Sequence, residues 1–288
     1  MQSSRFILFC LISLFLLLAA CSGNDSSAPL KSEAGYIEIE PISFSLQQQG
    51  LDTYSDTSST ARILYSFHPA SQDPAVKPLF VFLNGGPGCA TTTNLFSMNT
   101  APYTLDKLRT NGNPYAVNPY SWTALGNLLY IDTPNTGFSY NVVTGASDLN
   151  VRFSEFNSKN FNPFIDSANV IRVLLRFLDT HPLIRANQVV LVGESYSGTR
   201  VSTMLNLLLF YSKYGTGEKI YKDSALAAEI GRHLARVFPT EAAAGSLNPA
   251  IVARQFGRQI LIQPEISGPY QAEADGDLFE QTGSVIDR

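Results

Sequence analysis

The chain has 288 residues, which is enough for one large domain or two small ones. Hydrophobic residues make up 44% of it and charged residues only 15%, so a sizeable core can be buried. The formal net charge of −4 and the absence of a basic stripe argue against nucleic acid as a partner.

The N-terminus carries an apolar segment, FILFCLISLFLLLAA, that follows Arg5 and covers residues 6–20. A transmembrane helix needs about 20 apolar residues, so this segment is short for a membrane span. Its length is typical of the core of a secretory signal. We therefore expect residues 1–20 to be a signal peptide.

The signal ends in Leu18-Ala19-Ala20-Cys21, which resembles the lipobox of bacterial lipoproteins. The resemblance implies that Cys21 is diacylated and becomes the new N-terminus, and two acyl chains make a stable membrane anchor. Ser22 stands where an aspartate commonly retains such proteins at the inner membrane, so we expect the outer membrane or the cell surface. The alternative is an ordinary signal cut before Cys21, which would leave a soluble exported protein.

Residues 21–35 are rich in Ser, Gly, Asn and Asp and predict a tether between the membrane and a domain that starts at Tyr36. Short alternating runs follow, at 36–40, 42–46 and 62–67. Alternation with period two predicts antiparallel strands with one solvated face. The polar stretch DTYSDTSST, residues 52–60, is interpreted as a turn between them.

The pattern then changes to runs that are apolar throughout, at 78–83, 128–131 and 189–192. Such runs are typical of strands buried on both faces, as in parallel sheets covered by helices. Two helices are predicted beside them, at 166–180 and 199–211. The first has a stripe formed by Val170, Val173, Leu174, Phe177 and Leu178. Alternation of strand and helix predicts an α/β fold.

Ser195 lies at a strand-to-helix junction in VVLVGESYSG, between the small residues Gly193 and Ser197 and shortly before Gly198. This is the arrangement of a nucleophile elbow, in which only small neighbours permit a strained turn that exposes the serine. The strict pattern Gly-x-Ser-x-Gly has Ser197 at its last place. A serine that merely caps the following helix is the alternative without chemistry.

Two glycines, Gly85 and Gly86, come directly after another buried strand in FVFLNGGPGCA, residues 80–90. Glycines there allow the backbone to turn its N–H groups toward a reacting carbonyl. Together with the N–H of the residue after the nucleophile, they would form an oxyanion hole. A tight turn without chemistry is the alternative.

Four motifs, LNGGPGC, NPYSW, IDTPNTGFSY and GESYSG, resemble those of the serine carboxypeptidases in order and spacing, over roughly residues 36 to 210. The resemblance implies an α/β-hydrolase fold with a mostly parallel central sheet. It also implies that C-terminal residues are removed from peptides through an acyl-enzyme. We expect neither a cofactor nor a metal ion.

The resemblance assigns roles to three residues at the reacting centre. Ser195 would be the nucleophile that forms the acyl-enzyme. The N–H groups of Gly86 and Tyr196 would donate to the oxyanion.

Asn84 and Glu194, with Gly85 beside them, would bind the free C-terminal carboxylate of the substrate. Glu194 must be protonated to do so, because an ionised glutamate would repel a carboxylate; acidic conditions would favour binding. The family has a second glutamate downstream, and Asn99 in MNTAP aligns with it here. An amide never ionises, so recognition would depend less on pH. Phe82 replaces a family tryptophan and is expected in the pocket wall.

Ser195 needs a base, and in this fold the orienting Asp and the His follow the nucleophile in the chain. Of the three histidines, His68 and His181 precede Ser195, and His181 is expected at the end of the sheet opposite the elbow. Asp223 and His233 have the required order. Residues 223–238 predict one helix, however, on which the two would lie roughly 15 Å apart. We therefore expect His233 to be an ordinary residue on a helix flank.

Cys89 is the only cysteine of residues 22–288, so it is free or pairs with another molecule. The resemblance implies that its partner, and the triad Asp and His, lie downstream beyond a helical cap. We therefore expect residues 36–288 to be a hydrolase domain that is incomplete at its C-terminus. Residues 212–288 would include the start of the cap, and 257–267 would be the next sheet strand.

Two other functions remain open from the sequence. One is a catalytically incompetent fragment or a binding lipoprotein of the same fold, because no base for Ser195 is identified. The other is an esterase or acyltransferase on the same scaffold. Asn84 and Glu194 argue for carboxylate recognition instead.

Overall fold

The computed structural model describes residues 30–46, 54–94, 98–105, 114–142, 163–216 and 223–265. The strands are β1 (Glu33–Ile39), β2 (Ser43–Leu46), β3 (Tyr54–Thr57), β4 (Ala61–His68), β5 (Leu79–Leu83), β6 (Tyr103–Leu105), β7 (Tyr115–Val117), β8 (Asn127–Ile131), β9 (Tyr140–Asn141), β10 (Val189–Glu194) and β11 (Arg258–Ile262). The helices are η1 (Thr91–Thr93), η2 (Trp122–Ala124), α4 (Pro163–Thr180), α5 (Ser197–Thr216), α6 (Ser224–Val237), α7 (Pro239–Ala243) and α8 (Pro249–Phe256).

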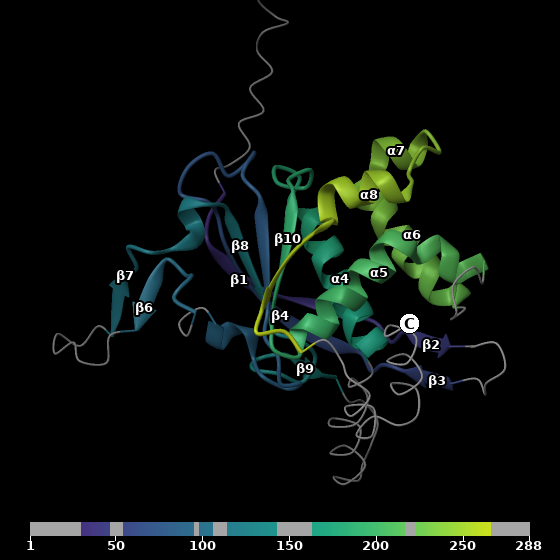
Figure 1. Cartoon of the computed structure of the whole chain (residues 1–288), viewed down its shortest axis with the longest axis horizontal. Helices are drawn as coiled ribbons and strands as arrows, with labels where there is room; N and C mark the ends of the chain where they lie inside the picture. Colours follow the sequence, from purple (N-terminus) through teal and green to yellow (C-terminus); the bar gives the residue numbers. More distant parts are fainter. Residues whose placement is uncertain are drawn as a thin grey trace, which may run out of the picture. The chain divides into compact units, whose positions relative to one another are not determined.

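A seven-stranded mixed sheet forms the centre of this fold (Figure 1), in the order β1-β4-β8-β5-β10-β11 with β9 on β4. The four strands β8, β5, β10 and β11 run parallel to one another, whereas β1, β8 and β9 pair antiparallel with β4. Every residue of β5 and β8 is buried, as their unbroken apolar sequences predict. The predicted α/β fold, with a parallel inner sheet, is confirmed.

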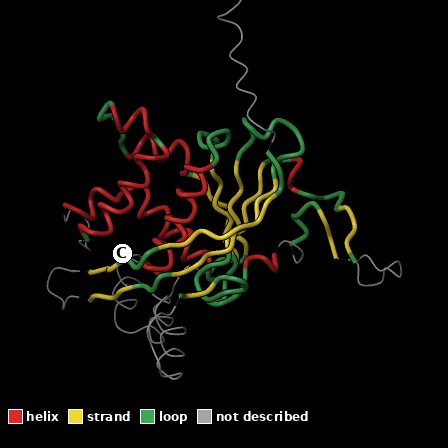
Figure 2. Tube along the Cα trace, turned by 180° about the vertical axis from the view of Figure 1, so that it is seen from behind, coloured by secondary structure: helices red, strands yellow, loops and turns green. Residues whose placement is uncertain are grey.

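The described α-helices gather on one side of the sheet (Figure 2), where α4, α5 and α6 pack against one another. All five residues of the predicted α4 stripe are buried. The other face of the sheet forms a cluster of aromatic and aliphatic side chains. Phe82 belongs to this cluster: it is fully buried, and its ring centroid lies 4.6 Å from that of Tyr130, on which it stacks, and 5.6 Å from that of Trp122. It is therefore a core residue and not the pocket wall that the sequence suggested.

The stretch at 52–60, interpreted as a polar turn, contains a strand, so that interpretation is wrong. Strand β3 pairs antiparallel with β2, and the hydroxyls of Ser43 and Thr57 lie 3.0 Å apart across the pair. The ribbon is anchored by Ile42, whose N–H donates to the buried Ser58 hydroxyl. The polar sequence at 52–60 has no apolar alternation, so the strand was not predicted.

The predicted helices are present with small shifts at their ends. Helix α4 begins at Pro163, three residues before the predicted start, and α5 begins at Ser197 and continues to Thr216. Helix α6 matches the predicted helix at 223–238, with Asp223 as its N-cap. Strand β11 lies within 257–267 and extends the sheet parallel to β10, as predicted.

The predicted signal peptide, Cys21 and the tether up to residue 29 lie outside the described residues, so their assignments stay predictions. Strand β1 begins at Glu33, three residues before the expected start of the domain. Among the residues that the structure describes, no helix is long and apolar enough to cross a membrane.

Candidate active site

Ser195 occupies a strained turn between β10 and α5. Its φ is +55°, a left-handed conformation that is uncommon for residues other than glycine. A Cβ on Gly193 would lie 2.5 Å from the carbonyl oxygen of Ser197, so only glycine fits before the turn. Ser195 is exposed, whereas Tyr196 and Ser197 after it are buried. The backbone therefore presents the Ser195 side chain at the carboxyl end of the parallel strands, which is the geometry of a nucleophile elbow.

The Gly85-Gly86 backbone lies directly against this turn. A Cβ on Gly85 would come within 2.7 Å of Ser195 Cβ and 2.8 Å of the Tyr196 nitrogen. The N–H of Gly85 donates to the Asn84 side chain at 2.8 Å and is thus occupied. Gly86 has φ +113°, and within the described residues its N–H donates to no protein acceptor. Of the two glycines, Gly86 is the one that can donate to an oxyanion beside Ser195.

A buried ion pair holds the carbonyl of Asn84, just before these glycines. Arg200 donates from Nε to Asp166 at 2.6 Å and from a terminal nitrogen to the Asn84 carbonyl at 2.6 Å. The Ser197 hydroxyl donates to the same carbonyl at 2.5 Å and accepts from Arg200. The arginine and aspartate side chains are only 2% and 5% exposed. Helices α4 and α5 thereby fix the loop that follows β5.

Asp166 and Arg200 were not predicted as members of the site. For Arg200 the available signal was its position, because it is the one charged residue of 199–211, a helix predicted to be buried. The helix of Asp166 carries several other charges, so nothing in the sequence set Asp166 apart. A charge that is buried must find a partner.

Asp132, which follows β8, ties a second loop to the first. It is fully buried and accepts from the N–H of Thr92 at 2.7 Å, from the Thr92 hydroxyl at 3.0 Å and from the N–H of Phe138 at 3.1 Å. Asn118, in the NPYSW motif, donates to the carbonyls of Asn99 and Ala101, both at 2.8 Å. These two motifs therefore support the loops around the elbow.

Asn84 and Glu194 lie side by side at the ends of neighbouring strands, because the register pairs Leu83 with Gly193 immediately before them. Both side chains are half-buried. Glu194 accepts a hydrogen bond from the Asn94 amide at 3.1 Å, and Asn94 itself is buried. The Asn84 amide donates to the Ala90 carbonyl at 3.0 Å and shapes its own loop.

Comparison with known proteins places the chain in a family. The family model described as serine carboxypeptidase matches residues 24–226, which is more than half of the chain.

The chain belongs to the serine carboxypeptidase family.

Several relatives of this chain are much longer than it is. Serine carboxypeptidase-like 41 of Arabidopsis thaliana is 26% identical over 239 residues, 80% of this chain and 47% of the relative. Carboxypeptidase Y of Komagataella phaffii is 30% identical over 175 residues, 60% of this chain and 29% of the relative. KEX1(DELTA)P, a prohormone-processing carboxypeptidase from Saccharomyces cerevisiae, aligns at 24% identity over 63% of this chain and 34% of its own, with a TM-score of 0.44. The chain thus spans less than half the length of these relatives.

The sequence analysis did not single out Asn94, whose amide is the hydrogen-bond partner of Glu194. Asn99 has φ +53°, and among the described residues no hydrogen bond joins it to Glu194. Its expected part in binding the substrate carboxylate stays a prediction. Nothing in the motif spacing distinguished Asn94, which is the C-cap of η1 in the structure.

His68 and His181 lie away from the carboxypeptidase elbow. The two ring nitrogens of His68 are 3.2 Å from the Ser66 hydroxyl and 3.3 Å from the Ser32 hydroxyl. His181 contacts the Phe177 carbonyl at 2.7 Å and the Glu33 carboxylate at 3.0 Å. As expected, His181 precedes β10 and is at the end of the strand opposite Ser195.

His233 is bound within α6, where its Nε2 lies 3.1 Å from the Glu229 carboxylate. Asp223 caps the same helix and accepts from Leu226 N at 2.7 Å and Ser45 N at 2.6 Å. The prediction that Asp223 and His233 do not form a catalytic pair is confirmed. His233 is only 6% exposed, however, so it faces a neighbouring element and not solvent.

Cys89 is exposed and carries a free thiol, on the loop that also holds Gly85 and Gly86. Its N–H donates to the Gly85 carbonyl at 3.2 Å and closes this loop. The free state fits the cysteine count of the sequence.

Proposed function

We propose that Ser195 is the acyl-forming nucleophile of a serine carboxypeptidase that removes C-terminal residues from peptides. The observation that carries the proposal is the left-handed, exposed Ser195 with the Gly85-Gly86 backbone against it. A serine that only capped α5 would need neither the strained φ nor a glycine loop packed on its Cβ. An esterase or acyltransferase would share this geometry, and the neighbouring Asn84 and Glu194 favour a substrate with a free carboxylate.

In the proposed reaction the Ser195 oxygen attacks the carbonyl carbon of the last peptide bond. The carbonyl oxygen becomes an oxyanion and accepts from the N–H groups of Gly86 and Tyr196, which point at developing charge. The tetrahedral intermediate collapses, the amine of the C-terminal residue leaves with a proton, and an acyl-enzyme remains. Water then hydrolyses the ester, so atoms balance without a cofactor.

The proton from Ser195 must go to a base, and His68, His181 and His233 are each hydrogen-bonded elsewhere. We infer that none of these three histidines supplies that base. The hydrogen bonds that occupy these histidines also favour the second candidate function. It is a protein of the same fold that binds a carboxylate without cleaving the peptide.

The specificity claim predicts a preference for peptides with a free C-terminus. In the proposed site the Glu194 side chain hydrogen-bonds the substrate carboxylate, and Asn84 and Asn94 shape the site around it. We expect a blocked dipeptide with a free carboxylate to bind at least about tenfold more tightly than its amide, since a hydrogen bond to a charged group contributes about 1.5–3 kcal/mol.

Calorimetry with the Ser195→Ala variant measures this preference without turnover. Glu194→Gln keeps a hydrogen-bond donor and should retain the preference, whereas Glu194→Ala should lose it. Equal affinity for the amide and the free acid would contradict carboxylate recognition. The natural protein is then incubated with the free-acid peptide. Release of the C-terminal residue would identify a carboxypeptidase, and binding without release would identify the binding protein.

We also propose that the protein is an exported lipoprotein anchored through Cys21. The lipobox-like sequence and the apolar core before it support this proposal. In the cells that make the protein, Cys21→Ala should move it from the membrane fraction to the soluble or uncleaved fraction, while Cys89→Ala, the matched cysteine control, should not. Continued membrane retention of mature Cys21→Ala protein would contradict the anchor.

A further inference from the structure

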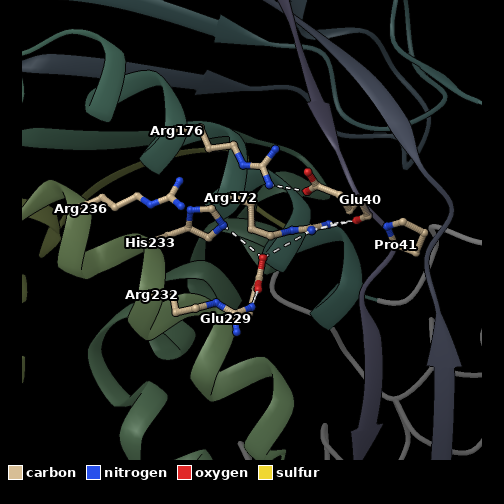
Figure 3. A pocket seen from close by; sticks show the side chains of 8 residues that line it. All are labelled: Glu40, Pro41, Arg172, Arg176, Glu229, Arg232, His233 and Arg236. Carbon is tan, nitrogen blue, oxygen red and sulfur yellow. Dashed lines mark hydrogen bonds and ion pairs between the residues drawn. The ribbon is translucent and has the colours of Figure 1, made fainter.

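A cavity of about 390 Å³ lies between α4, α6 and the segment that joins β1 to β2 (Figure 3). Its volume is within the range of small-molecule sites. The walls carry Arg172 and Arg176 from α4, and Arg232, His233 and Arg236 from α6. None of these residues belongs to the elbow or to the loops that support it.

The charges of this cavity do not balance. Four arginines face it, and only two carboxylates, Glu40 and Glu229, oppose them. Glu229 is shared among Arg232, Arg172 at 3.8 Å and His233 at 3.1 Å. Within the part of the chain that is described, Arg236 has no acidic partner. At neutral pH the walls therefore keep an excess of two positive charges.

Two deeply buried side chains in the walls have hydrogen-bonding capacity to spare. Arg172 is 1% exposed, and its Nε finds no acceptor among the described residues. The Nε2 of His233 faces a carboxylate and must carry the hydrogen, so its Nδ1 is left with a lone pair that can take up a proton.

The pKa values of these two groups are lowered first by burial and then by the positive charges around them. Burial, followed by the charges of Arg176, Arg236, Arg172 and Arg232, lowers the pKa of His233 to about 4. Burial and the charge of Arg176 lower the pKa of Arg172 to about 10. A positive potential disfavours every added proton and favours an anion.

A structural role accounts for the α4 arginines alone. Both terminal nitrogens of Arg172 donate to the Glu40 carbonyl at 2.8 Å, and Arg176 donates to the Glu38 carbonyl at 2.5 Å, so these two fasten the end of β1 to α4. Arg232 is 71% exposed and bonded only to Glu229, and Arg236 is also exposed. Neither is needed to fasten β1, yet both extend the positive wall from the other helix.

We propose that this cavity is a second binding site, for a phosphate monoester group. Such a group carries a charge of about −1.5 to −2 at neutral pH, which matches the excess in the walls. Guanidinium groups bind phosphate oxygens through paired N–H donors, and arginine clusters are a recurrent means of recognising them. The group could belong to a soluble metabolite or to the headgroup of a lipid such as phosphatidic acid.

Calorimetric titration with glycerol phosphate, at constant ionic strength set by chloride, tests the proposal. Residues 232 and 236 are exposed, so Arg232→Gln/Arg236→Gln should fold normally, which circular dichroism verifies. We expect saturable binding to the wild type and a loss of at least about tenfold in affinity in the double variant. Arg254→Gln, an exposed arginine on α8 outside the cavity, should bind as the wild type does.

Nuclear magnetic resonance of the histidine rings locates the ligand. Glycerol phosphate should raise the pKa of His233, because a bound dianion favours its protonated ring. Neither His68 nor His181 lines the cavity, and both should be unaffected. The proposal would be overturned if the wild type showed no saturable binding, or if Arg232→Gln/Arg236→Gln bound glycerol phosphate as tightly as the wild type. It would also be overturned if the ligand left the pKa of His233 unchanged.

Vesicles distinguish the two sources of the phosphate. The Cys21→Ala protein, which has no acyl anchor, is floated with vesicles of phosphatidylcholine alone or mixed with phosphatidic acid. Capture by phosphatidic acid that Arg232→Gln/Arg236→Gln abolishes assigns the site to a lipid headgroup. Glycerol phosphate binding without such capture assigns it to a soluble ligand. The Ser195→Ala variant should behave as the wild type throughout, so failure here is separable from failure of the proposed carboxypeptidase.

Discussion

Ser197 stands where the pattern Gly-x-Ser-x-Gly has its last glycine, and its hydroxyl has a specific use. It donates to the Asn84 carbonyl and accepts from Arg200, so it joins the elbow helix to the loop that carries Gly85 and Gly86. A glycine at this place would leave that carbonyl with Arg200 alone. The departure from the pattern thus keeps the small size that the turn needs and adds an anchor for the oxyanion loop.

The Asp166–Arg200 pair should dominate the stability of the site. Arg200→Met would leave a buried aspartate without its partner, and breaking a buried pair in this way costs about 3–5 kcal/mol in the free energy of unfolding. Arg62→Gln, which breaks the exposed Arg62–Glu38 pair, should change it little, because solvent screens such pairs. Urea denaturation measures both. Equal losses in the free energy of unfolding for Arg200→Met and Arg62→Gln would contradict the prediction that the buried pair contributes more to stability than the exposed pair.

At the scale of elements, β11 and the elbow act as one unit. Ser195 donates its N–H to the Ile262 carbonyl at 3.1 Å, and its own carbonyl accepts from the N–H of Glu265 at 2.8 Å. Pro264 also packs on Gly198, where a Cβ would come within 2.6 Å. The segment that leaves the last described strand therefore wraps the turn that carries the nucleophile and helps to hold its strained φ.

The contact between α4 and α6 makes stability depend on pH through His233. The folded ring has a pKa of about 4, below its ordinary 6.5, since burial and then the charges of arginines on both helices oppose the proton. Between these two values the unfolded chain binds more protons than the folded one. The contribution of this group is therefore fully present above pH 6.5 and is lost as the pH falls toward 4.

His233→Gln should flatten that part of the pH dependence, because glutamine can still donate to Glu229 but does not titrate. Urea denaturation across this pH range, in chloride buffers without phosphate, measures the slope. An unchanged slope in the variant would assign the acid sensitivity to other groups.

At the scale of the whole molecule, the inner sheet was predictable because its strands have a distinctive apolar sequence. The runs at 79–83, 127–131 and 189–194 are apolar at nearly every position, and burial on both faces requires that. Ser195 was found by the same route, since a turn of small residues between such a strand and an apolar helix is typical of a nucleophile elbow.

What the sequence did not reveal depends on contacts between distant residues. Asn94 reaches Glu194 across 100 residues, and Arg172 reaches Glu40 across 132. Polar pairs of this kind leave no periodic pattern, and Arg200 only appeared as a charge in an apolar helix. Strand β3 was missed because the polar sequence at 52–60 shows no apolar alternation.

Ser195 as an activated nucleophile is the central claim, and labelling tests it directly. The protein as its own cells make it would be treated with a fluorophosphonate and weighed intact by mass spectrometry, beside Ser195→Ala and the triple variant His68→Gln/His181→Gln/His233→Gln, with circular dichroism to confirm folding. We predict a single adduct on the wild type, its loss in Ser195→Ala and its retention in the triple variant. An adduct that survives Ser195→Ala, or a folded wild-type protein that takes up none, would contradict Ser195 as the nucleophile. Loss of the adduct in the triple variant would contradict our inference that none of these histidines supplies the base.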